Sequence, residues 1–169
     1  MEEEKRYAVL LTDHHEVKVI EQQPGEEVFD CGRRAIGCDW IELVNLTHFR
    51  KANLLMMIDE EGKIKDGEKY VNCVASYMYG TQAHGDPIIG NAVLIQSAGE
   101  DLVMMTKADA ERMAERVSEM LKFAIPMFSQ RLHLIPAPAK GIRDDLQKKD
   151  PDKTVSPRRQ RCNQDSMER

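Results

Sequence analysis

The fold class is decided by residues 7–20, which read YAVLLTDHHEVKVI. Two short aliphatic runs flank the polar segment Thr12–Glu16, and this arrangement is typical of two strands joined by a turn. In the second run Val17 and Val19 fall on one face and Lys18 on the other, as in a half-buried strand. The stretch therefore favours a sheet that is at least partly antiparallel.

Along the rest of the chain, strand patterns alternate with helical ones. Short aliphatic runs predict strands, and apolar side chains that recur every three or four residues predict helices. Together they predict a single small α+β domain with a mixed or antiparallel sheet and two to three helices. The expected elements are helices over 26–36, 68–79 and 106–124, strands over 40–46, 54–58 and 88–95, and a hairpin partner for 54–58 over 63–65.

The last helix has the clearest pattern. Thr106–Asp109 resembles a capping box, in which side chains at the helix start satisfy free backbone N–H groups. Met113 and Val117 lie on one apolar face, and charged side chains cover the rest. The apolar residues of Phe123–Phe128 and Leu132–Ile135 are expected to pack back on the domain, because exposed they would form an apolar patch.

Charge and composition divide the chain near residue 135. The 169 residues carry a formal net charge of -5. Residues 136–169 have a charge of +3, four prolines and no aromatic residue, which leaves -8 on residues 1–135. We therefore expect an α+β domain over 1–135 and a disordered, charged tail over 136–169. Arg158, Arg159 and Arg161 indicate either a nucleic-acid-binding arm or only a solubilising tail.

Several classes of protein are disfavoured by what the sequence lacks. No apolar run approaches the roughly 18 residues that span a bilayer, and the acidic start is unlike a signal peptide. We therefore expect a cytoplasmic protein without membrane association. No two cysteines form a Cys-x-x-Cys pair, and phosphate-binding glycine loops, G-x-S-x-G and H-E-x-x-H motifs are missing. We expect no catalytic residue, no cofactor and no metal, which favours a protein that is not an enzyme without excluding one.

Two clusters of residues of the types that bind metal ions can also be explained as solvated turns. His14 and His15 stand between Asp13 and Glu16, and they indicate either a metal site or a solvated turn. Adjacent strand residues point to opposite faces, so both imidazoles reach one ion only from a bent turn. The acidic run Asp59–Glu61 indicates either a cation site or a solvated turn. A solvated turn is the expectation for both.

The candidate binding residues are Tyr79, His84 and Asp86, which we expect on a loop after the helix over 68–79. Aromatic, imidazole and carboxylate groups fall within eight residues there, and such groups can stack on a ring and fix its orientation. A loop held by a rigid scaffold is also where recognition is usually placed. The alternative is that His84 and Asp86 form a general acid–base pair in a hydrolase.

Five segments form an ordered pattern: Ile36–Val44, Met57–Ile64, Asn72–Ala75, Asp86–Ile95 and Thr106–Asp109. In their order and spacing they resemble the domain of unknown function family 3846, and the resemblance covers roughly residues 7–122. The segments Tyr79–Asp86 and Thr47–Asn53 depart from the family pattern, and the tail from Pro136 lies outside it.

The resemblance implies a small protein encoded by phages, plasmids or Firmicutes, near mobile-element genes. The family has no assigned activity, so the resemblance carries no functional residue over. Since the sequence shows no catalytic constellation, we expect a non-catalytic binding module for a host protein or a small nucleotide-type ligand. One alternative is a host-defence inhibitor that mimics nucleic acid through the acidic domain, whose charge makes direct nucleic-acid binding unexpected. The other is the hydrolase that uses His84 and Asp86. The oligomeric state stays open.

Overall fold

The computed structural model describes residues 4–131 except 48, 50–52 and 67–69, and for 127–131 it describes the backbone alone. The boundary near residue 135 and the expected disordered tail over 136–169, with Arg158, Arg159 and Arg161, lie outside the described residues.

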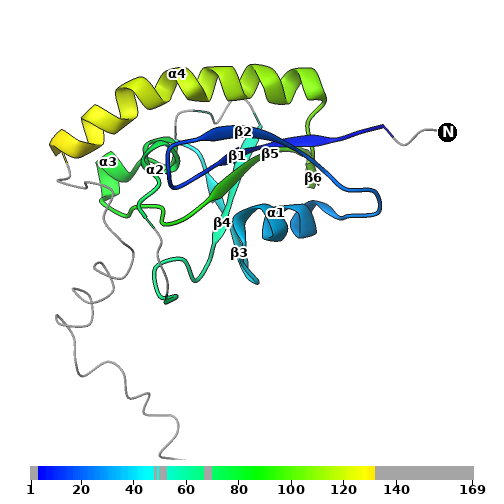
Figure 1. Cartoon of the computed structure of the whole chain (residues 1–169), viewed down its shortest axis with the longest axis horizontal. Helices are drawn as coiled ribbons and strands as arrows, with labels where there is room; N and C mark the ends of the chain where they lie inside the picture. Colours follow the sequence, from blue (N-terminus) through cyan, green and yellow to red (C-terminus); the bar gives the residue numbers. More distant parts are fainter. Residues whose placement is uncertain (1–3, 48, 50–52, 67–69, 132–169) are drawn as a thin grey trace, which may run out of the picture.

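An antiparallel sheet with helices on both faces makes up the described part of the chain (Figure 1). The strands follow the order β2-β1-β5-β4-β3, and β6 pairs with β5. All of these pairs are antiparallel, which confirms the predicted α+β class. The elements are β1 (Tyr7–Leu11), β2 (Val17–Glu21), α1 (Val28–Ile36), β3 (Ile41–Asn45), β4 (Leu54–Asp59), α2 (Cys73–Tyr79), α3 (Thr81–His84), β5 (Ala92–Ala98), β6 (Asp101–Val103) and α4 (Lys107–Arg131).

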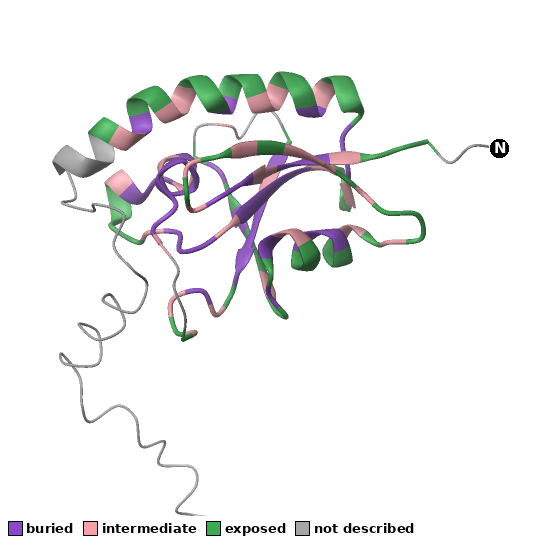
Figure 2. Cartoon of the chain, viewed as in Figure 1, coloured by how far each residue is buried: buried purple, intermediate pink, exposed green. Residues whose placement is uncertain are grey.

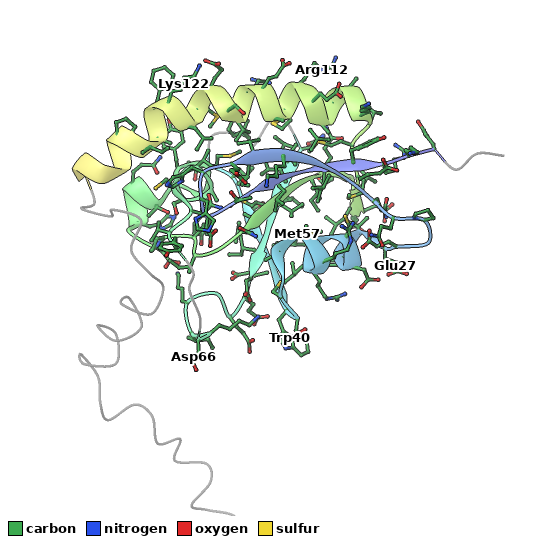
Figure 3. The ribbon with its side chains drawn as sticks, viewed as in Figure 1. Glu27, Trp40, Met57, Asp66, Arg112 and Lys122 are labelled. Atoms are coloured by element: carbon green, nitrogen blue, oxygen red, sulfur yellow. The ribbon has the colours of Figure 1, made fainter. Side chains whose placement is uncertain are left out.

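The two faces of the sheet bury separate cores (Figure 2). Alternate residues of a strand point to opposite faces, so Leu94 of β5 packs toward α2 and α4, while Val93 and Ile95 pack toward α1. The long helix α4 covers the first face, and its outer side carries exposed charges such as Arg112 and Lys122 (Figure 3). The shorter helix α1 covers part of the second face.

Helix α1 approaches the sheet closely because Gly32 faces it. A methyl group at this position would overlap the Sδ of Met57 and lie 2.9 Å from the Cδ1 of Ile41. Glycine weakens a helix by about 1 kcal/mol relative to alanine, so here close packing outweighs helix propensity. The helix ends where expected, at Gly37 with a φ of +79°.

The chain between β4 and β5 differs most from the sequence prediction. Residues 63–65 form a turn and a bend and no strand, and β4 pairs instead with β3 and β5. Helix α2 begins at Cys73 instead of residue 68, because the Asn72 side chain caps it by accepting the Ala75 N–H at 3.1 Å. The same side chain donates to the carbonyl oxygens of Leu11 and Gly90, each at 3.0 Å. Strand β5 begins at Ala92 and not at residue 88, and β6 and α3 were not predicted.

Helix α4 begins as predicted and ends later. The Thr106 hydroxyl accepts the Asp109 N–H at 3.2 Å and donates to its carboxylate at 2.7 Å, which confirms the predicted cap by Thr106, with the carboxylate bound to the hydroxyl in place of the Thr106 N–H. The helix continues past Pro126, and Phe123 is 69% exposed, so the expectation that this side chain packs back is wrong. A turn of 3.6 residues puts Ala124, seven after Val117, on the buried face and leaves Phe123 off it. No helix within the described ranges is both long and apolar enough to cross a membrane.

Candidate functional site

The three candidate residues lie around the short helix α3, at one end of the sheet. Tyr79 ends α2, His84 ends α3 and Asp86 follows it, so the expected loop contains a helical turn. The rings of Tyr79 and His84 are in contact, with centroids 4.7 Å apart and planes at 68°. The structure thus brings two of the three side chains together edge to face.

Two glycines give the segment its sharp turns. Gly80, with a φ of +95°, ends α2 and donates its N–H to the carbonyl oxygens of Ser76 and Tyr77, each at 3.1 Å. Thr47 lies so close that its Oγ1 would be 2.5 Å from a Cβ at Gly80. Gly85, with a φ of +77°, ends α3 in the same way. Only glycine adopts such angles without strain, so these positions fix the direction of the segment.

The His84 imidazole is held by the main chain on both sides. Its Nδ1 accepts the Asp86 N–H at 3.1 Å, and its Nε2 lies 3.4 Å from the carbonyl oxygen of Tyr79. The Asp86 carboxylate pairs with Lys63 instead of with the imidazole. A general acid–base pair needs a ring nitrogen free to exchange a proton with substrate. This geometry fixes the ring in place and gives the hydrolase interpretation no support.

A small hollow of about 80 Å³ opens beside Tyr79, between the end of α2 and the residues that follow β4. Burial raises the pKa of the Tyr79 phenol, and the negative charges of Asp86 and Glu42 raise it further, so the hydroxyl stays protonated. Four carboxylates and one ammonium group line the hollow, which makes it acidic. Its walls are Glu42, Ile58, Asp59, Glu60, Gly62, Lys63, Tyr79, Asp86, Pro87, Ile88 and Ile89.

Glu42 and Lys63 are members of this site that sequence reasoning missed. Glu42 stands alone between apolar neighbours on β3, and Lys63 lies in a segment predicted as a strand. Both come from chain segments far from residues 79–86, and no local pattern connects them to that segment. Contacts formed only by the fold, such as the Lys63–Asp86 pair, leave no signal in one sequence.

The other two ligand-type clusters lie at turns and differ in how their side chains are bonded. His15 adopts a φ of +65°, and burial together with the neighbouring His14 lowers the pKa of its imidazole. Asp59 is only 5% exposed and accepts hydrogen bonds from the Lys65 Nζ at 3.1 and 3.3 Å, so the expectation of a solvated turn is wrong for this residue. Among the described side chains, no group of three or more His, Cys, Asp or Glu is placed to hold a metal ion.

A larger open hollow, of about 1190 Å³, lies at the other end of the molecule. Its described walls are residues 4–6 and 21–26, which include no aromatic ring. Charged pairs occupy both sides, among them Lys5 with Glu21 at 2.9 Å. This hollow offers water-exposed charges and no surface on which a base could stack, so it is a weaker candidate than the smaller one.

Comparison with known families gives one match. The sequence model described as Domain of unknown function (DUF3846) matches residues 5–118. The chain belongs to the DUF3846 family. No curated protein and no solved structure shows significant similarity to it. The match includes α2, α3 and the acidic hollow of this DUF3846 protein, so the candidate site lies within the family domain.

Proposed function

We propose that this protein is a non-catalytic binding module that holds a positively charged side chain of a partner protein in the hollow beside Tyr79. The observation that carries the proposal is the hollow itself, in which one aromatic ring stands among four carboxylates. Asp59 is paired with Lys65 and Asp86 with Lys63, so the attraction for a cation comes chiefly from Glu42 and Glu60. An ammonium or guanidinium group is attracted both by the carboxylates and by the face of a tyrosine ring.

The size of the hollow favours a protein partner over a nucleotide-type ligand. Ligand pockets usually enclose about 300–1000 Å³, whereas this one measures about 80 Å³. That volume accommodates the end of one side chain and not a base with its sugar. The main-chain contacts on both nitrogens of His84 favour binding over turnover, because they leave this imidazole without a free nitrogen for proton transfer.

The biological setting belongs to the same proposal. We place the protein in the cytoplasm, as an accessory protein of a phage or another mobile element that acts on a host protein. The host-defence inhibitor that mimics nucleic acid has less support, since many described acidic side chains are paired with basic ones. Such pairs include Glu16 with Lys18, Asp30 with Arg33, Glu26 with Arg34 and Glu119 with Lys122.

The proposal is tested with a defined probe in an NMR titration of the ¹⁵N-labelled chain. Acetyl-Gly-Arg-Gly-amide should shift the backbone amides of residues 79–86, while the citrulline tripeptide, which has the same shape and no charge, should not. Tyr79→Phe should preserve the effect, since the ring remains, and Tyr79→Leu should abolish it. Shifts caused by AMP and not by the arginine peptide would overturn the choice of partner.

A further inference from the structure

We infer that the outer edge of β3 is an interface at which two copies of this chain pair their β3 strands antiparallel about a two-fold axis. Strand β3 is the last in the order β2-β1-β5-β4-β3, so its backbone pairs with β4 on one side. No described strand pairs with its other side. The inference concerns self-association and stands apart from the partner site beside Tyr79.

The β3 edge lacks the lysine, proline and bulge that most often protect an edge strand, and Glu42 is its one charged residue. Native edge strands are blocked by lysine, proline or a bulge. The five residues of β3 include no lysine and no proline. They pair one-to-one with β4 from Ile41 opposite Asp59 to Asn45 opposite Leu55, which leaves no room for a bulge.

Apolar side chains are exposed along this edge. Leu43 is 37% exposed although it stands in the middle of a strand, and Trp40, just before β3, is 62% exposed. Trp40 projects away from the sheet at the start of this strand (Figure 3). Helix α1 contacts this face at Ile41, through Gly32, and leaves Leu43 partly uncovered.

The sequence of β3 is complementary to itself in one antiparallel register. This points to β3 of a second copy as the strand that pairs with this edge. If two strands pair antiparallel with Leu43 at the centre, Leu43 faces Leu43, Glu42 faces Val44, and Ile41 faces Asn45. No like charges then stand opposite each other, which is a condition for stable cross-strand pairs. A two-fold interface uses the same patch on both subunits, so this self-complementarity is the property it needs.

The first experiment exploits the residue on the two-fold axis. The full-length chain is examined by sedimentation velocity and native mass spectrometry, with Leu43→Lys and Leu43→Glu as variants. Each variant alone places like charges opposite each other and should weaken dimerisation at least tenfold. An equimolar mixture should form the mixed dimer, because Lys then faces Glu. Lys18→Glu, on the opposite edge strand, is the matched control and should leave the dimer unchanged.

A second measurement keeps the inference testable if the charged variants fold poorly. Directly opposed antiparallel residues have Cα atoms about 4.5–5.5 Å apart, within the span of a disulfide. In a Cys162→Ser background, Leu43→Cys should cross-link to its own copy under mild oxidation. Asn45→Cys should not, since its copy lies several residues away in this register. A wild-type chain that stays monomeric, or a dimer that neither Leu43 charge weakens, would overturn the inference.

Discussion

The two edge strands of the sheet, β2 and β3, differ in the charged side chains and the packing that protect them. Strand β2 carries Lys18 near its start, paired with Glu16 at 2.6 Å, and α4 packs against the strand. The guanidinium of Arg34 also donates to the Glu21 carbonyl oxygen at 3.1 Å, which occupies a backbone acceptor at the end of the strand. Strand β3 has an exposed leucine, and among the described residues α1 covers the strand only in part, at Ile41.

The contrast teaches where in this fold an interaction surface is to be expected. An edge that carries lysine and is covered is closed to further strands, whereas an edge with an exposed leucine and neither lysine nor proline is more open. The acidic hollow beside Tyr79 lies next to the open edge, since Glu42 of β3 is one of its walls. The proposed partner site and the proposed pairing edge therefore both lie at the β3 end of the sheet, and the lysine and arginine described above lie at the β2 end.

The largest loss of stability is expected from a core substitution in α4, the helix that packs against β2. Val117 of α4 is fully buried against the sheet, so Val117→Asp places an unpaired charge in that core. We expect the free energy of unfolding to fall by about 3–5 kcal/mol. Urea denaturation measures this loss, with Glu115→Ala on the exposed side of α4 as the control that should change by less than about 0.5 kcal/mol. Equal effects of the two variants would contradict this orientation of the helix.

A smaller loss of stability is expected at the contact between Gly80, which ends α2, and Thr47, which follows β3. Gly80→Ala strains a backbone with a φ of +95° and drives the new methyl group against Thr47, which follows β3. Strain of this kind costs about 1–3 kcal/mol. Gly25→Ala has a φ of +73° and open space around it, so it measures the strain without the clash. Thermal unfolding should show a greater loss for Gly80→Ala, and equal losses would mean that Thr47 moves aside freely.

The ion pair between Arg34 and Glu26 gives a prediction about how stability depends on pH. The hydrogen bonds from Arg34 lower the pKa of the Glu26 carboxyl from 4.5 to about 2. The pair therefore stabilises the fold fully above pH 4.5 and loses this contribution as the pH falls toward 2. Arg34→Met should cost about 1 kcal/mol at neutral pH, since solvent screens the guanidinium, and should flatten stability over that range.

The matched control for this pair is Arg33→Met on the same helix. Arg33 pairs with Asp30 on the exposed side, so its removal should leave the pH dependence intact. Urea titrations at a series of pH values distinguish the two variants. A wild-type slope that survives in Arg34→Met would show that another carboxyl is responsible.

The smallest effect on stability is expected from a substitution of Lys18. This substitution tests directly whether the lysine is what distinguishes the β2 edge from the β3 edge. Lys18→Leu should change the free energy of unfolding by less than about 0.5 kcal/mol, since the side chain is exposed. It should nevertheless make β2 resemble β3 and add a second mode of association, which dynamic light scattering detects. If the variant associates no more than the wild type, α4 and Arg34 alone protect that edge.

The sequence predicted the parts of the fold that depend on local periodicity. The hairpin of β1 and β2 follows from alternation at Val17 and Val19, and the start of α4 follows from Thr106 and Asp109. The start of α2 was predicted too early because the helical spacing does not show that Asn72 caps the helix. Its amide bonds to Leu11 and Gly90, far away in the chain, and a periodic pattern contains no trace of such contacts.

The candidate site was predictable to the same extent. Tyr79, His84 and Asp86 fall within eight residues, so their proximity was visible in the sequence, and the structure places the rings of Tyr79 and His84 in contact. The acidic wall at Glu42 and the partner of Asp86 at Lys63 depend on the fold and were missed. The contacts of His84 also depend on the fold, because its two ring nitrogens face the main chain at Tyr79 and at Asp86.

The hydrogen bonds of the Asn72 amide bear on the order in which α2 and residues 79–86 fold. Helix α2 has seven residues, too few to persist alone in water, and its cap is held by carbonyls of two other segments. Its formation must wait until the end of β1 and the approach to β5 have met, so it belongs to the late events of folding. An excised peptide over residues 70–90 would carry the tyrosine, the imidazole and the carboxylate and still lack their arrangement, which only the assembled domain confers.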